Sequence, residues 1–311
     1  MKKLLTLITI GILSLFIFVG CSSSSNENNN QSNSSQNKIK ITHSKGETEV
    51  PTNPKKVVVF DLGILDIISS LNIDTEVAVP TSLPKSLSKY NSAKTVGSIK
   101  EPNLEAIHEF KPEVIFISGR QEDYYDELNK IAPTVYVDLE TASYMEDFSN
   151  NVKNIGKIFN KTKEADAKLA EINSKVEEGT KKASASNEKA LIVLTNNGNL
   201  SAYGKGSRFG FVHDVLGVKT ADETIKASTH GQEANYEYIA KVNPDILFVV
   251  DRTTITGGEK TATATLENDL IKKTNAYKNK KIVYLDPEAW YLVGGGISTV
   301  ETMVDEVVNA L

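Results

Sequence analysis

The chain has 311 residues, a formal net charge of −5 and one cysteine. These values exclude an intramolecular disulfide and argue against nucleic-acid binding, which needs a basic surface. Of 35 basic residues only three are arginine, namely Arg120, Arg208 and Arg252. Because arginine offers a flat, permanently charged fork that lysine lacks, this sparing use points to recognition of oxyanions and aromatic rings.

The amino terminus predicts export. Two lysines precede an apolar run over residues 4–19, and small residues follow, as in a secretory signal. Phe18-Val19-Gly20-Cys21 resembles a bacterial lipobox, so we expect residues 1–20 to be removed and Cys21 to carry a lipid anchor. A plain signal peptide with a chance cysteine is the alternative. Residues 21–38 are rich in Ser, Asn and Gln, which predicts a flexible tether.

After the tether, short β-branched segments alternate with helical ones, a pattern typical of a parallel sheet covered on both faces. The first half predicts strands at 55–60, 76–79, 114–118 and 135–137, and helices at 62–71 and 103–111. The stretch 145–182 lacks proline and carries apolar residues at three- and four-residue steps. This periodicity predicts one amphipathic helix, which at about 1.5 Å per residue would be roughly 50 Å long.

A second strand–helix series follows. We predict strands at 190–195, 200–203, 246–250 and 282–285, and helices at 211–216, 236–242 and 297–311. The expected fold is therefore α/β, with two Rossmann-like lobes joined by one long α-helix. We assign residues 39–143 to the first lobe, 144–183 to the linking helix and 184–311 to the second lobe.

An internal repeat places two of the arginines. Residues 104–120 and 236–252 both read as a short helix, a proline break, a buried strand and then an arginine. Ligands of open α/β sheets bind beyond the carboxyl ends of the strands, which is where Arg120 and Arg252 are expected. Arg208 lies in the glycine-rich loop 204–210 after another strand. We therefore expect three guanidinium groups to face a cleft shared by both lobes.

The repeat, the long helix and the three arginines together resemble the substrate-binding lipoproteins of bacterial iron-siderophore importers, class III of the periplasmic-binding-protein-like proteins. Within that group the chain is most similar to petrobactin and catecholate siderophore-binding proteins. The resemblance implies a non-enzymatic, monomeric receptor on the extracytoplasmic face of the membrane. It would have no cofactor, and it would deliver a ferric siderophore to the subunits of an ABC permease. Arg120, Arg208 and Arg252 match the arginine triad of the family.

Two further residues match family positions that bind iron. His230 lies in a polar loop and Tyr291 precedes a glycine run, and ferric iron accepts both imidazole and phenolate ligands. The resemblance implies that both complete the iron shell when a siderophore supplies only four donors. Their alternatives are a solvent-exposed loop residue and an aromatic packed beside Trp290. We also expect Trp290 to adjoin the ligand.

Glu105 and Glu237 begin the equivalent helices of the two repeats. The resemblance implies that one acidic residue per lobe docks on arginines of the permease, an arrangement that would fix orientation and speed encounter. An ordinary glutamate favoured at a helix start is the alternative.

Other functions fit the sequence less well. Haem or a hydroxamate siderophore is the rival ligand, although hydroxamate complexes are often neutral or cationic and suit three arginines poorly. A surface-anchored hydrolase would need a nucleophile and a base, and no Gly-x-Ser-x-Gly sequence occurs. A structural surface protein would not need an arginine-lined cleft. No dense His/Cys cluster favours a bare transition metal, and loop 204–210 does not fit the dinucleotide-binding spacing.

Overall fold

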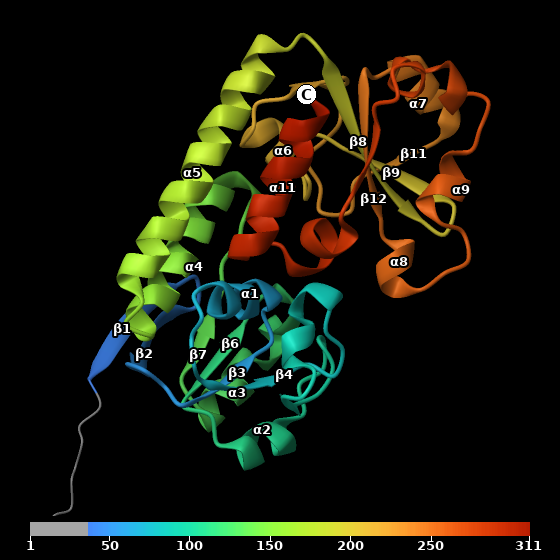
Figure 1. The fold of residues 1–311 in the computed structure, drawn as a ribbon. Helices are drawn as coiled ribbons and strands as arrows, with labels where there is room; N and C mark the ends of the chain where they lie inside the picture. Colours follow the sequence, from blue (N-terminus) through green and yellow to red (C-terminus); the bar gives the residue numbers. More distant parts are fainter. Residues whose placement is uncertain (1–36) are drawn as a thin grey trace, which may run out of the picture. The chain divides into compact units, whose positions relative to one another are not determined.

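The first lobe is built on a parallel sheet with the strand order β5-β4-β3-β6-β7, drawn in blue to green in Figure 1. The computed structural model describes residues 37–311, so Cys21, the expected signal segment and nearly all of the tether lie outside the described residues. The strands are β3 (Lys56–Val59), β4 (Glu76–Val79), β5 (Lys94–Thr95), β6 (Val114–Ile117) and β7 (Thr134–Tyr136).

Helices connect these strands, and side chains cap the starts of α1 and α2. Asp61 accepts a hydrogen bond from the Ile64 backbone N–H at 2.9 Å, which satisfies a donor at the start of α1 that has no partner within the helix. The helical elements are α1 (Leu62–Ser70), η1 (Lys85–Tyr90), α2 (Leu104–Phe110), η2 (Gly119–Tyr124) and α3 (Tyr125–Ile131). A hairpin of β1 (Lys38–His43) and β2 (Gly46–Pro51) precedes them and was not predicted.

The second lobe contains a mixed sheet with the order β11-β9-β8-β12-β13, and β10 pairs with β8. Its strands are β8 (Lys189–Asn196), β9 (Asn199–Tyr203), β10 (Lys219–Thr220), β11 (Gln232–Ala234), β12 (Ile246–Asp251) and β13 (Ile282–Leu285). Its helices are α6 (Phe211–Asp214), α7 (Tyr236–Val242), α8 (Thr253–Thr256), α9 (Ala262–Leu266), η4 (Ile271–Lys273), α10 (Asn275–Lys278), the π-helix η5 (Glu288–Val293) and α11 (Ile297–Ala310). The α/β fold class is confirmed.

The prediction of one uninterrupted helix over residues 145–182 was wrong. After the short turn η3 (Thr141–Ser143), the stretch forms α4 (Tyr144–Ile158) and α5 (Thr162–Ala185). Asn160 takes a left-handed backbone conformation with φ 54° and ends the first helix. A Cβ at Gly156 would lie 2.7 Å from the Ala165 Cβ, so glycine lets the two helices meet closely. Helix α5 has 24 residues, or about 36 Å at about 1.5 Å per residue.

The predicted repeat is confirmed down to its caps. Asn103 and Asn235 occupy the N-cap positions of α2 and α7, and each side chain accepts a backbone N–H three residues later. Both helices end in a left-handed residue, Lys111 or Asn243, directly before a proline. The strands that follow, β6 and β12, pair in parallel with β3 and β8 in the same manner. Equivalent local rules therefore place an arginine at the same edge of each sheet.

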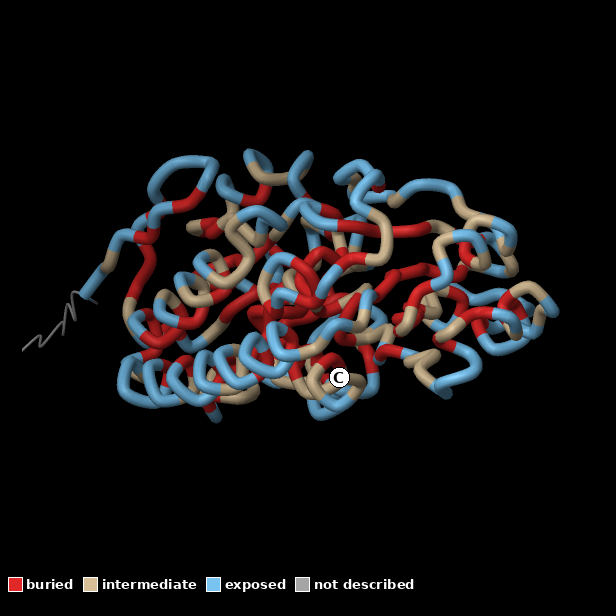
Figure 2. The backbone as a smooth tube through the Cα atoms, turned by 90° about the horizontal axis from the view of Figure 1, so that it is seen from above, coloured by how far each residue is buried: buried red, intermediate tan, exposed pale blue. Residues whose placement is uncertain are grey.

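A continuous core and one buried carboxylate tie the lobes together. One cluster of buried apolar side chains includes residues of β3, α1, α4, α5, β8, β12 and α11. Figure 2 colours buried residues red, and they gather in the interior of the molecule. Asp66 of α1 is only 4% exposed and caps the start of α11. It accepts the backbone N–H groups of Ser298 at 2.9 Å and Thr299 at 3.2 Å, and the Ser298 hydroxyl at 2.6 Å.

Replacing this carboxylate tests the tie between α1 and α11. We expect Asp66→Ala to lower the free energy of unfolding by about 3 kcal/mol, because it leaves buried donors at the start of α11 without an acceptor. Urea unfolding followed by far-ultraviolet circular dichroism measures the change. Asp74→Ala, at an exposed position, serves as the control, and equal midpoints for the two variants would contradict this role of Asp66.

Candidate functional site

Arg120 is held at the carboxyl end of β6 by a buried turn. The adjacent Gln121 is 1% exposed, and its side chain accepts from the Ser118 backbone N–H at 3.1 Å and donates to the Ile99 carbonyl. This anchoring leaves the Arg120 side chain directed at the second lobe. Its Nη2 donates to the backbone carbonyls of Tyr291 at 3.4 Å and Leu292 at 3.1 Å.

Arg208 lies in the loop 204–210 after β9, and this loop is tightly fixed. The Asp214 carboxylate accepts the Gly206 N–H at 2.6 Å, and the Arg208 backbone N–H donates to the Ser228 carbonyl at 3.4 Å. The Arg208 Nη2 donates to the Tyr291 carbonyl at 2.7 Å. The loop therefore presents Arg208 to the same backbone oxygen that Arg120 contacts.

Arg252 directly follows β12, and its neighbour Asp251 fixes the chain there. The Asp251 carboxylate accepts the backbone N–H groups of Thr253 at 3.0 Å and Ala262 at 2.7 Å. The Arg252 Nε is buried and has no hydrogen-bond partner among the described residues. A buried donor without an acceptor is costly, and such a group in a native structure points to a functional role for the Arg252 side chain.

Tyr291 joins the three arginines into one group, which we call the arginine cluster: Arg120, Arg208, Arg252 and Tyr291. Its carbonyl accepts from Arg120 and Arg208. Its ring centroid lies 4.2 Å from the guanidinium carbon of Arg208 and 5.4 Å from that of Arg252, within the range of cation–π attraction. The structure thus brings together the residues that the sequence analysis expected to meet.

The cluster is crowded with positive charge. Burial lowers the pKa of Arg208, and the charges of Arg120 and Arg252 lower it further, while Tyr291 and Tyr203 oppose the shift. Arginine stays protonated in proteins, so the cluster keeps three charges in partly desolvated surroundings. Such an arrangement favours an anionic partner. The negative charge of that partner would reduce the repulsion between the guanidinium groups, and its oxygen atoms would accept hydrogen bonds from them.

A carboxylate in the same helix as Tyr291 ties this helix to the first lobe. Tyr291 lies in the π-helix η5, a type of helix that is frequent at functional sites. Glu288 at the start of η5 accepts from the backbone N–H groups of Lys85 at 3.0 Å and Ser86 at 3.1 Å. These first-lobe contacts fix the segment that carries the shared carbonyl.

His230 lies in an exposed loop beside the cluster. The His230 carbonyl accepts the Tyr203 hydroxyl at 2.9 Å, and Gly231 packs so closely that a Cβ there would lie 2.6 Å from the Tyr203 ring. Burial raises the pKa of Tyr203, while the charges of Arg208 and Arg252 pull it down. Tyr203 therefore contacts the backbone of the His230 loop and senses two charges of the cluster, and the His230 residue is exposed.

Trp290 does not line the cluster. Its side chain is 5% exposed, packs edge-on against Phe211 and donates its indole N–H to Glu306 at 2.7 Å. Its apolar body fills the core while Tyr291, the next residue, points to the arginines. We therefore leave Trp290 out of the direct ligand contacts.

Glu105 and Glu237 are exposed in the first turns of α2 and α7. The matching caps of the two helices give both carboxylates the same local setting, one in each lobe. His108 is likewise exposed, whereas His213 is buried and its Nδ1 lies 2.7 Å from the Val218 carbonyl.

The sequence analysis missed one charged neighbour of the cluster, Asp61. It follows β3, which pairs with β6, so it lies beside the segment that leads to Arg120. Burial raises the pKa of Asp61, and the charge of Arg120 opposes that rise. The sequence feature that could have identified Asp61 is its position after a predicted buried strand, at the sheet edge where ligands of α/β folds bind.

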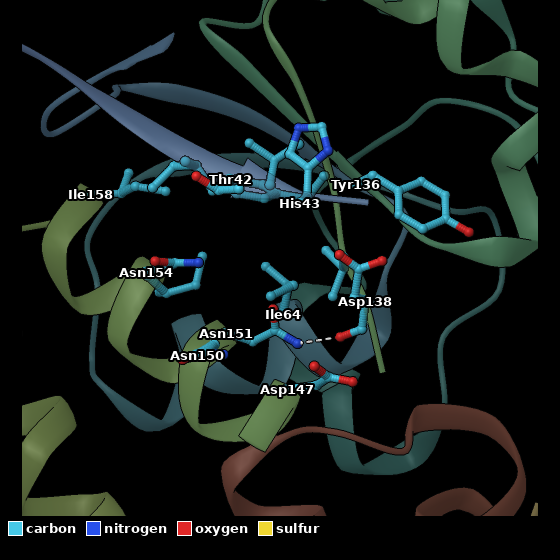
Figure 3. A pocket seen from close by; sticks show the side chains of 15 residues that line it. Thr42, His43, Ile64, Tyr136, Asp138, Asp147, Asn150, Asn151, Asn154 and Ile158 are labelled. Carbon is cyan, nitrogen blue, oxygen red and sulfur yellow. Dashed lines mark hydrogen bonds between the residues drawn. The ribbon is translucent and has the colours of Figure 1, made fainter. Parts of the chain in front are cut away.

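A separate hollow lies in the first lobe, next to β1 and α4. Figure 3 shows His43, Asp138, Asp147, Asn151 and other side chains around it, and its cavity volume is about 70 Å³. The His43 Nδ1 accepts the Lys45 N–H at 3.2 Å, and its Nε2 lies 2.9 Å from the Thr48 hydroxyl. None of the three arginines lines this hollow. Across residues 37–311 no group of three His, Cys, Asp or Glu side chains is placed to hold a metal ion.

Two α/β lobes with a fixed helical connection and a cationic junction define a solute-binding protein. The chain belongs to the periplasmic binding protein family, whose model matches residues 57–289. This membership confirms the family resemblance and the prediction of a binding protein in place of an enzyme. None of the helices in the described region is both long and apolar enough to cross a membrane.

Named relatives support this assignment. The petrobactin-binding protein YclQ of Bacillus subtilis is 46% identical over 277 residues, 88% of this chain and 87% of the relative. Its crystal structure matches with a TM-score of 0.85 at 44% identity, covering 88% of this chain and 98% of that chain. The ferric-anguibactin-binding protein FatB of Vibrio anguillarum is 36% identical over 279 residues, 87% of each chain.

A further solved structure is that of the periplasmic catecholate-siderophore binding protein VctP of Vibrio cholerae. It matches with a TM-score of 0.82 at 36% identity and covers 87% of this chain and 99% of that chain. The relatives that this chain resembles over most of its length are therefore siderophore-binding proteins of iron uptake.

The lone tryptophan allows a test of its own surroundings. Burial raises the pKa of Glu306 above its ordinary value of 4.5, so the carboxyl that accepts the Trp290 N–H takes up a proton above pH 4.5. We expect Trp290 emission to change on acidification with a midpoint above 4.5. Because the folded-state pKa is raised, this group favours the folded state increasingly as pH falls. Glu306→Gln abolishes the transition; its persistence in that variant would refute the assignment.

Proposed function

We propose that this protein captures a ferric catecholate-type siderophore, such as ferric petrobactin, and delivers it to an ABC permease for iron uptake. The observation that carries the proposal is the convergence of three guanidinium groups from both lobes on Tyr291, with a buried donor of Arg252 unpaired. The names of YclQ and VctP support the same ligand class.

The chemistry of the ligand matches the cluster. Iron(III) bound by three catecholates carries three net negative charges and exposes aromatic rings. Arginine can donate hydrogen bonds to catecholate oxygens and lie against the rings at once. Each charged hydrogen bond contributes about 1.5–3 kcal/mol. A neutral hydroxamate complex would leave the three positive charges uncompensated, and haem would require a large apolar slot, so neither rival explains the cluster as well.

Removing a guanidinium group tests the proposal. We expect Arg120→Ala, Arg208→Ala and Arg252→Ala each to weaken binding of ferric petrobactin by tenfold or more, because each removes charge and hydrogen bonds that face the ligand. Isothermal titration calorimetry gives the dissociation constants. Lys163→Ala, which removes an exposed charge on α5, is the matched control. Wild-type affinity in all three arginine variants would remove this mechanism.

We further propose that His230 and Tyr291 bind iron directly when the siderophore offers only four donors. Imidazole and phenolate are suitable ligands for iron(III). His230 is exposed, and the Tyr291 ring is only partly buried. With hexadentate siderophores both side chains would serve as neighbours of the complex and not as metal ligands.

Two ligands of different denticity separate these roles. We expect His230→Ala and Tyr291→Phe to weaken binding of a ferric bis-catecholate about tenfold or more and to shift its visible absorption spectrum. A hexadentate tris-catecholate should bind His230→Ala as it binds the wild type. Tyr291→Phe keeps the carbonyl and the ring that the arginines contact, so it isolates the phenol oxygen. If both variants bind the tetradentate complex with wild-type affinity, His230 and Tyr291 do not coordinate its iron.

We propose that Glu105 and Glu237 dock the two lobes on the permease. Both are exposed, and each begins the equivalent helix of its lobe. Two separated carboxylates define an orientation as well as an encounter.

Charge reversal separates docking from ligand capture. The double variant Glu105→Lys/Glu237→Lys is expected to abolish siderophore-dependent iron uptake by cells while leaving the dissociation constant of the purified protein unchanged. The variant Glu109→Lys, in the same helix as Glu105 but outside its first turn, is the control. Normal uptake by the double variant would remove the docking proposal.

We also propose that the receptor is a monomer anchored outside the cell membrane by a lipid on Cys21, with residues 22–38 as its tether. The lipobox-like sequence and the Ser/Asn-rich composition support this arrangement. A lipid anchor keeps the protein near the permease while the tether lets the folded lobes reorient.

A further inference from the structure

Asp61 lies at the place where the strand order of the first sheet reverses. Strand β3 is followed along the chain by β4 on one side, while β6 and β7 lie on the other. The register pairs Val59 with Phe116, so continuing it two residues brings Asp61 opposite Ser118. Such a reversal point is the usual ligand-binding position of an open α/β sheet. Asp61 therefore lies beside the expected ligand, next to the turn that carries Arg120.

The surroundings of Asp61 leave its charge only partly compensated. From α1, it receives the Ile64 N–H at 2.9 Å and faces the Gly63 backbone. From the end of β6, it meets the Ser118 hydroxyl, and the charged group that faces it is Arg120. The segment after η5 approaches through Gly295, whose backbone lies against Gly63 and brings no charge. Arg120 is not close enough to form an ion pair, because no oxygen of Asp61 lies within 4.0 Å of its nitrogens.

The second lobe has no carboxylate at the corresponding place. The repeat makes Val114 equivalent to Ile246, and their partners across the ladders are Val57 and Ala190. Counting four residues onward from each partner, Asp61 corresponds to Leu194, which is buried. The first lobe thus has a carboxylate at this place, whereas in the second lobe the carboxylate nearest to Arg252 along the chain is Asp251, whose oxygens accept the backbone N–H groups of Thr253 and Ala262.

We propose that Asp61 is a specificity-determining counter-charge, and that capture of a polyanionic ferric chelate is coupled to uptake of a proton by this carboxyl group. The inference rests on the proposed function. An ionised Asp61 repels an anion that lies against Arg120, and a protonated Asp61 does not. The bound state therefore holds a proton on Asp61 more tightly than the free protein does.

The sign of the resulting pH dependence follows from linkage. Since burial already raises the pKa of Asp61 in the free protein, an anion bound nearby raises it further. Affinity then increases as pH falls through the pKa of the complex, and this gain is complete below the pKa of the free protein. Above both pKa values, Asp61 is ionised in the free protein and in the complex, so its full repulsion of the bound anion remains. Among anionic chelates, those with less charge near Asp61 are favoured at neutral pH.

The variant Asp61→Asn tests the proposal without removing the helix cap, because asparagine is as good an N-cap residue as aspartate. We expect Asp61→Asn to bind ferric petrobactin at least about threefold more tightly than wild type at pH 8. This ratio shrinks as pH falls to 5. Because both proteins meet the same ligand, protonation of the siderophore cancels in the ratio. Asp74→Asn, an exposed change just before β4 at the opposite sheet edge, controls for net charge.

Proton uptake gives a second measurement. Calorimetric titrations across the range from pH 5 to pH 8, in two buffers of different ionisation enthalpy at each pH, should show more protons taken up on binding by wild type than by Asp61→Asn within this range. Equal or weaker binding by Asp61→Asn at pH 8, or equal proton uptake, would overturn the counter-charge. Absence of ferric siderophore binding by the wild type would instead overturn the proposed function, and the inference with it.

Discussion

The backbone carbonyl of Tyr291 is the point on which the two lobes depend for their shared site. It accepts hydrogen bonds from Arg120 of the first lobe and Arg208 of the second, and the ring of the same residue faces Arg252. Glu288 fixes this segment to the first lobe through backbone N–H groups. Like charges can be held together here because a peptide oxygen and an aromatic face supply local negative potential.

These contacts also explain how a cationic site persists in an acidic protein. Arg120 and Arg208 have an internal acceptor, whereas the buried Arg252 donor has none. A bound anion would compete with the Tyr291 carbonyl for the donors of Arg120 and Arg208. The continuous core and the Asp66 cap on α11 limit how far the lobes can separate. We therefore propose that recognition relies on a preorganised cluster, which lowers the entropy cost of binding.

Much of this arrangement could be read from the sequence because it follows local rules. The proline breaks, asparagine caps and buried strands of the repeat dictated where Arg120 and Arg252 lie. The break at Asn160 was missed because the apolar periodicity continues across it, whereas the left-handed Asn160 and the close packing at Gly156 appear only in the structure. Trp290 and Tyr291 are adjacent but face opposite ways in a π-helix, which no periodicity signals. From the sequence alone, Asp61 is an ordinary helix cap. Only the pairing of β3 with β6 shows that it lies near Arg120.

The central claim is that charge complementarity selects the ligand. The most direct measurement is the affinity of the purified protein for ferric petrobactin compared with that for a neutral ferric hydroxamate of similar size, in one buffer at neutral pH. The account predicts binding of the anionic complex at least about a hundredfold tighter, equivalent to about 2.7 kcal/mol. Equal or tighter binding of the neutral hydroxamate would contradict it.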